Sequence, residues 1–129
     1  MNTKNFTIDV KGSVTGEHYK GLFKIKPLLS HKDKLRRDEI RRSLLGERAV
    51  DASENAQTMA SIFSKIYIHL IDAPSWWTNA DNGSDLLDEE PVQQVLTEVL
   101  RIENEQIDSV KKAGEEAKKE LAAEVKKDA

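Results

Sequence analysis

The sequence predicts an α+β fold, with an N-terminal β-hairpin followed by a small helical bundle with a long charged C-terminal helix. Up to Pro27, apolar residues alternate with polar ones; beyond it they recur every three or four residues, the change from strand to helix periodicity. Apolar residues make up 38% of the 129 residues, which suffices for one domain with a modest core. We expect a single globular domain over residues 1–110 and a charged helical or disordered tail over residues 111–129.

The first element is a hairpin over residues 5–26. Gly16 suits a turn that needs a positive φ, and Pro27 ends the ladder because it has no N–H to donate. A lone hairpin is marginal in water, so it must pack on helices or belong to a larger sheet. Its buried face is expected to carry Phe6, Ile8 and Val10 from one strand and Tyr19, Gly21, Phe23 and Ile25 from the other.

Two helices are expected next, at about residues 30–45 and 54–72. Ser30 is a typical N-cap for the first helix, and Gly46 suits the position after its end. Irregular apolar spacing leaves open that the first consists of two shorter helices. The second is expected to be the central core helix and to end before Pro74. Its apolar stripe consists of Ala56, Met59, Ala60, Phe63, Ile66, Tyr67, Leu70 and Ile71.

The last helix is expected at residues 89–110, with Asp88 as its N-cap. A helix that continued to residue 126 would be about 57 Å long, whereas a globule of this size has a radius of gyration of about 14 Å. Its end must therefore project, bend at Gly114 or fray.

The sequence carries no enzyme signature, and we expect neither a catalytic site nor a cofactor or metal. The three histidines lack the spacing of a zinc motif, and no glycine-rich loop joins a strand to a helix. The absence of cysteine excludes disulfides and thiol chemistry. No apolar run is long enough for a membrane span or a signal peptide, so we expect a cytoplasmic protein without a membrane partner.

Residues 32–48 form the best candidate for nucleic-acid binding, because they include seven lysines and arginines. Asp33, Asp38, Glu39 and Glu47 are interleaved with them, and no aromatic residue is present to stack on bases. The acidic stretch 51–107 would also repel phosphate. These features argue against nucleic acid as a partner and favour orientation on a protein by complementary charge.

The Trp76–Trp77 pair is the strongest indication of a partner surface. In an extended chain, neighbouring side chains point in opposite directions, so one Trp can fill the core while the other is a hot spot at the surface. The alternative is that both are core residues. The full set of candidate partner-binding residues is Trp76, Trp77, Leu96, Val99, Ile102 and Ile107.

Four motifs give the chain a wider resemblance. They are V-T-G-E-x-Y-x-G-x-F at 14–23, R-R-x-L-L-G at 41–46, A-P-x-W-W at 73–77 and N-G-x-D-L-L-D-E at 82–89. With the charged C-terminal helix, this layout resembles the small tail assembly chaperones of long-tailed bacteriophages. The resemblance implies a non-catalytic role in virion morphogenesis: binding the helical tape measure protein and helping tail tube protein polymerise around it. It also implies a site of action in the host cell cytoplasm and absence from the mature virion.

Two other interpretations remain open. A hairpin with helices is also a plausible structural phage tail component, and residues 32–48 could serve a small nucleic-acid-binding regulator. Homo-oligomerisation is compatible with all of them.

Overall fold

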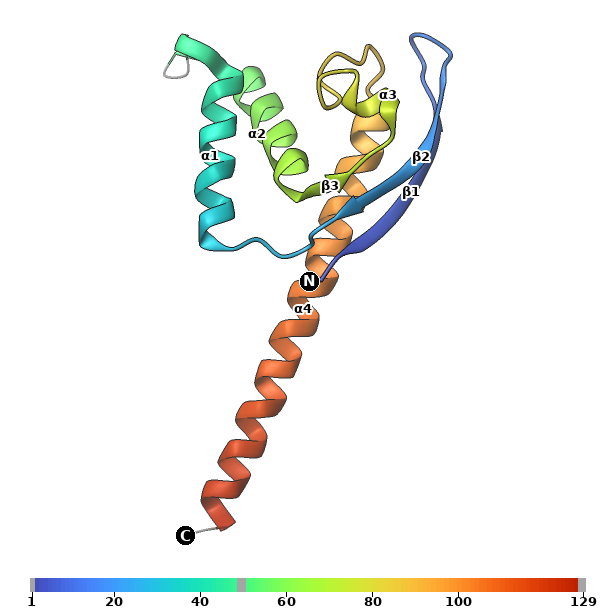
Figure 1. Ribbon diagram of the computed structural model, residues 1–129. Helices are drawn as coiled ribbons and strands as arrows, with labels where there is room; N and C mark the ends of the chain where they lie inside the picture. The colour runs from blue at the N-terminus through green and yellow to red at the C-terminus, as the bar shows by residue number, and fades with distance from the viewer. Residues whose placement is uncertain (1, 49–50, 128–129) are drawn as a thin grey trace.

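The computed structural model describes residues 2–48 and 51–127 and has the expected α+β architecture (Figure 1). Residues 1, 49–50 and 128–129 of the predicted domain and tail lie outside the described residues, as does the side chain of Arg48. The elements are β1 (Lys4–Lys11), β2 (His18–Ile25), α1 (His31–Leu45), a 3₁₀ turn (Gly46–Arg48), α2 (Glu54–His69), β3 (Leu70–Asp72), α3 (Ser75–Thr78) and α4 (Glu90–Lys127).

The predicted hairpin is confirmed and belongs to a three-stranded antiparallel sheet in the order β1-β2-β3. Its pairing runs from Lys4 opposite Ile25 to Lys11 opposite His18. The side chains that alternate in the sequence lie on one buried face, where the rings of Phe6 and its cross-strand neighbour Phe23 stack at 5.1 Å. This face supplies half of the core.

The predicted helix 54–72 is too long by three residues. Leu70 is extended, with φ −70° and ψ 131°, and begins β3, which pairs with the end of β2. The helix ends because these residues satisfy the free edge of β2, and Pro74 disfavours helix just before it. A stripe with helical spacing can thus change to strand when a sheet edge offers partners for its backbone.

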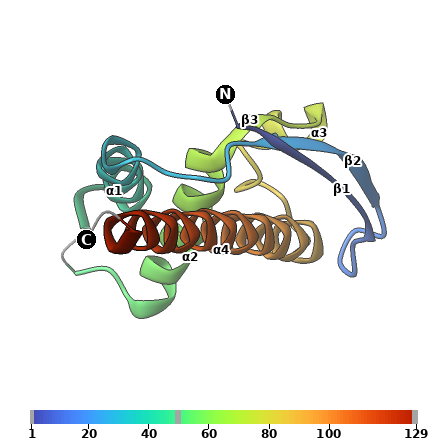
Figure 2. The ribbon, with the colours of Figure 1, turned by 90° about the horizontal axis from the view of Figure 1, so that it is seen from below.

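The core lies between the sheet and α4, which crosses one face of the hairpin (Figure 2). Helix α2 packs beside α4 and contributes Ile66. The buried apolar cluster consists of Phe6, Ile8, Phe23, Ile25, Ile66, Trp77, Val95, Val99 and Ile102.

Helix α1 is a single helix whose ends follow the sequence prediction. The Ser30 hydroxyl accepts a hydrogen bond from the Asp33 N–H, and the Asp33 carboxylate accepts one from the Ser30 N–H, which forms a capping box. Gly46 follows the helix with φ 73°, a conformation that favours glycine. None of its residues is buried, and it packs mainly on α2. Helix α1 is therefore a flank of the domain and not part of its core.

Helix α4 continues without a bend through Gly114 and projects from the domain (Figure 1). Its described side chains from Asp108 to Ala123 are all exposed. Of the three expected outcomes for this segment, projection is the one observed.

Candidate partner-binding site

The turn of the hairpin encloses the carboxylate of Asp88. One carboxylate oxygen accepts hydrogen bonds from the N–H of Val14 (2.7 Å) and of Thr15 (3.1 Å). The other accepts from the Thr15 hydroxyl (2.5 Å) and the Tyr19 hydroxyl (2.6 Å). Asp88 was predicted to cap α4, and that prediction is wrong: its carboxylate accepts these four hydrogen bonds from the hairpin, and its side chain is buried.

The environment of Asp88 favours its charged form. The Thr15 hydroxyl, the Tyr19 hydroxyl and the backbone N–H groups lower its pKa to about 2. A Cβ atom at Gly12 would lie 2.2 Å from the carboxyl group, so this position has room only for glycine. Glu90 extends the same contact by accepting a hydrogen bond from the Ser13 N–H (3.1 Å). The hairpin turn and the start of α4 are thereby joined as one unit.

The two tryptophans lie on the short helix α3 and differ in exposure. Trp77 is fully buried and meets Phe23 edge-on, with ring centroids 5.6 Å apart. Trp76 is half-buried, packs on the ring of Tyr19 and donates its indole N–H to the carbonyl of Lys20 (3.0 Å). The expected division into a core Trp and a more exposed Trp is therefore observed, although a helical turn and not an extended chain produces it.

Glycines let the motif segments approach one another closely. A Cβ atom on Gly21 would lie 2.3 Å from the ring of Pro74, and one on Gly83 would lie 2.6 Å from the ring of Trp77. Gly83 also has φ 88°, which disfavours other residues. The segments 14–23, 73–77 and 82–89 thus meet in one junction, which we call the motif junction. Its contacts are internal, so these motifs act first in building the fold.

Three of the predicted partner-binding residues are not available to a partner. Trp77 is the buried member of the tryptophan pair, and Val99 and Ile102 are buried between the sheet and α4, so the assignment of these three to a partner surface is wrong. Val99 and Ile102 were chosen because they share an apolar stripe, and the hairpin covers that stripe. Leu96 and Ile107 are half-buried and keep part of their surface open.

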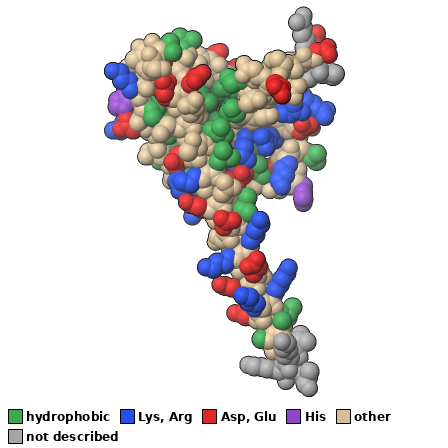
Figure 3. All heavy atoms as spheres, turned by 180° about the vertical axis from the view of Figure 1, so that it is seen from behind, with side chains coloured by type: hydrophobic (Ala, Val, Ile, Leu, Met, Phe, Trp, Pro, Cys, Tyr) green, Lys and Arg blue, Asp and Glu red, His purple; other side chains and the backbone are tan. Residues whose placement is uncertain are grey.

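An open groove runs between α2 and α4, on the side of α4 away from the sheet. It encloses about 380 Å³, and its apolar floor is formed by Ile62, Leu96 and Leu100. Figure 3 shows hydrophobic side chains gathered in the middle of this face, next to lysines and arginines. The polar and charged rim consists of Arg37, Glu54, Gln57, Thr58, Ser61 and Lys65. We call this surface the α2–α4 groove.

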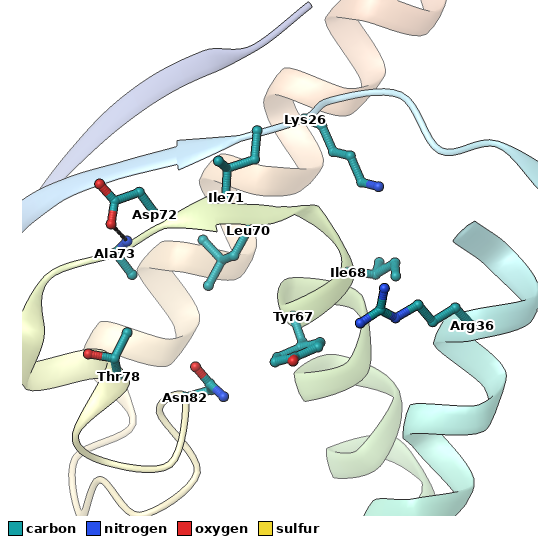
Figure 4. A pocket seen from close by; sticks show the side chains of 10 residues that line it. All are labelled: Lys26, Arg36, Tyr67, Ile68, Leu70, Ile71, Asp72, Ala73, Thr78 and Asn82. Atoms are coloured by element: carbon teal, nitrogen blue, oxygen red, sulfur yellow. Dashed lines mark hydrogen bonds between the residues drawn. The ribbon is translucent and has the colours of Figure 1, made fainter. Parts of the chain in front are cut away.

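A second groove follows the other face of α2, opposite the segment 78–84. Two adjoining hollows, of about 530 and 490 Å³, form it. Figure 4 shows the second of them, with Tyr67 and Asn82 projecting toward the gap from its two sides. We call this surface the α2 groove. Its apolar lining consists of Leu44, Leu45, Ala52, Ala56, Met59, Ala60, Phe63, Tyr67, Ile68, Leu70, Ile71 and Ala73.

The α2 groove corrects the expectation that the whole apolar stripe of α2 is core. Met59 is 47% exposed and Tyr67 is 41% exposed, while Ile66 is 1% exposed. Phe63 is half-buried at the groove. The helix is wedged between α1 and α4, which leaves this part of its apolar surface without a partner within the described residues.

A buried charged cluster fixes α2 against α4 below the grooves. Lys65 Nζ lies 2.8 Å from Glu103 Oε1, and both side chains are largely buried. The ring of His69 is fully buried; Nδ1 lies 2.7 Å from the Lys26 carbonyl, and Nε2 lies 2.9 Å from Glu103 Oε2 without forming a hydrogen bond. Burial lowers the pKa of His69, although Lys26 and Glu103 oppose that effect. This cluster holds the walls of the α2–α4 groove at a fixed separation.

The cations of α1 are partly engaged within the chain. Arg41 and Arg42 both pair with Asp38, and Arg37 donates to the Ser61 carbonyl (3.3 Å). Acidic residues interleaved with the basic ones thus neutralise part of the basic segment.

Within residues 2–48 and 51–127, no group of three His, Asp or Glu side chains is placed to hold a metal ion. In the same part of the chain, no helix is both long enough and apolar enough to cross a bilayer. No family model, curated protein or solved structure matches this chain.

Proposed function

We propose that the protein is a non-catalytic tail assembly chaperone of a long-tailed phage or prophage. It binds the helical tape measure protein and promotes assembly of tail tube protein around it, in the host cell cytoplasm and without entering the mature virion. The observation that carries the proposal is the motif junction. The proposal starts from a resemblance in widely separated motifs, and three of these form one three-dimensional unit. These contacts support the proposal, because they give the spacing of the motifs a role in joining the hairpin turn, α3 and the start of α4.

The α2–α4 groove is the surface that we assign to the client. Its floor of Ile62, Leu96 and Leu100 offers the apolar contacts that an amphipathic helix needs. Ile107 extends this surface along α4 by about two turns. Polar rim residues keep the groove soluble when it is empty and can pair with the flanks of a bound helix.

Co-expression with the tape measure protein encoded in the same phage tests the proposal. The wild-type chain should co-purify with it and keep it soluble. Leu100→Lys should reduce client affinity at least tenfold, because it places a charge on the apolar floor of the groove. Gln94→Lys adds the same charge at an exposed position on another face of α4 and should leave binding unchanged. If the wild type did not co-purify with the tape measure protein, the proposed function would be contradicted. If both variants bound it equally well, the assignment of the client to the α2–α4 groove would be contradicted.

Two alternatives make different predictions. A structural tail component would persist in purified virions. A nucleic-acid-binding regulator would show salt-dependent DNA or RNA binding. The pairing of Asp38 with two arginines makes the latter the weaker alternative.

A further inference from the structure

The projecting part of α4 carries an apolar stripe that the other described residues leave largely exposed. Val110 is 51% exposed and Leu121 is 64% exposed. At about 100° per residue they share one helix face with three other residues. The stripe consists of Ile107, Val110, Gly114, Ala117 and Leu121. We call it the α4 stripe.

The α4 stripe is flanked by opposite charges. Lys111 and Lys118 lie on one side of it, and Glu120 lies on the other, as the helical periodicity requires. The α2 groove also has opposite charges on its two sides. Lys26 and Arg36 line one side of the hollow in Figure 4, and Asp72 lines the other from β3.

The two unpartnered surfaces are also similar in length. From Ala56 to Tyr67, α2 rises about 17 Å, and from Ile107 to Leu121, α4 rises about 21 Å. Gly114 and Ala117, in the middle of the stripe, have small side chains. They would let the α4 helix approach the α2 groove closely at Phe63, which lines the groove.

The tail cannot fill the α2 groove of its own molecule. Helix α4 is unbroken and leads away from the domain (Figure 1), so its projecting part does not return to α2 of the same molecule. We therefore propose that the α2 groove receives the projecting α4 stripe of a second copy of this chain. This contact shares Ile107 with the proposed client surface but fills a different groove, on the other face of α2, so it goes beyond the chaperone function and requires no client.

The absence of cysteine permits a direct test with the pure full-length protein. Ser84→Cys lies in the wall of the α2 groove, and Ala117→Cys lies on the α4 stripe. Mixed in equal amounts under mild oxidation, the two variants should form a disulfide-linked dimer. Ala123→Cys, nearly opposite Leu121 on the helix, should form little dimer with Ser84→Cys.

Sedimentation of the protein without engineered cysteines provides the second measurement. The wild type should associate as its concentration rises, and Leu121→Lys should weaken this association about tenfold, while Ala123→Lys should not. A monomer at every concentration would overturn the proposal. So would a dominant dimer formed by Ala117→Cys alone, because that result would show that two tails pair with each other. Neither result would bear on client binding, which is measured separately.

Discussion

At the scale of single residues, Asp88 accepts four long-range hydrogen bonds. It connects the start of α4 to a turn more than 70 residues earlier in the chain. Four donors surround its carboxylate, so the charged form is well solvated although the side chain is buried. A neutral side chain would leave donors unsatisfied, and a longer one would collide with Gly12.

We predict that Asp88 makes the protein sensitive to acid. The folded pKa is about 2, whereas an unfolded Asp titrates near the usual value of about 4. Its contribution to stability is therefore complete above pH 4 and is lost as the pH falls toward 2. Urea unfolding measured from pH 5 to pH 2 should show this loss. The Asp88→Asn variant should be less stable than the wild type at pH 5, and its unfolding free energy should change less with pH. If the unfolding free energies of the two proteins fell in parallel as the pH is lowered, Asp88 would not be the source of the acid sensitivity.

The sequence indicated the importance of Asp88 but not its role. An acidic residue just before a helix has the local signature of an N-cap, and only the tertiary fold brings the hairpin turn against it. The same reason applies to Val99 and Ile102, whose spacing showed an apolar face but not which element covers it. Leu96 and Ile107 were predicted from the same pattern and do retain open surface.

At the scale of elements, α2 has two different apolar faces. Ile66 faces the core, whereas Phe63, one turn earlier, lies at the α2 groove. Hydrophobic periodicity predicted the helix and its N-terminal boundary well. It could not divide the stripe between core and groove, because both faces are apolar and their partners come from distant segments. The strand at residues 70–72 was missed for a related reason, since it depends on a free edge of β2.

We predict that the two faces respond differently to truncation. Ile66→Ala should cost about 2–5 kcal/mol of unfolding free energy, because it leaves a cavity in a closed core. Phe63→Ala should cost less, about 1–2 kcal/mol, since the ring lies at the α2 groove and part of its surface is already in water. Urea denaturation of the two variants gives both values. A larger loss for Phe63→Ala would mean that the α2 groove is closed in solution.

At the scale of the whole molecule, a compact domain carries a long helical arm. The sheet, α2 and the first four turns of α4 share one core, and the rest of α4 depends on local helix stability and solvent. The sequence predicted this division through the thinning of apolar residues after Val110. It left projection, bending and fraying open, because Gly114 weakens a helix without always breaking it.

We predict that removing the residues after Val110 leaves the domain folded but ends its self-association. No described side chain from Lys111 to Ala123 is buried, so the melting temperature should change by less than about 2 °C, compared with the roughly 4 °C that 1 kcal/mol produces in a domain of this size. Thermal unfolding followed by circular dichroism measures the first effect and sedimentation the second. Gly114→Ala in the full chain is the control: it should raise helix content without changing the melting temperature of the domain, because a Cβ atom there meets no neighbour within 4 Å. At a concentration where the full chain is monomeric, a large fall in the melting temperature of the truncated protein would show that the arm packs back on its own domain, and the groove of a second copy would then not be its partner.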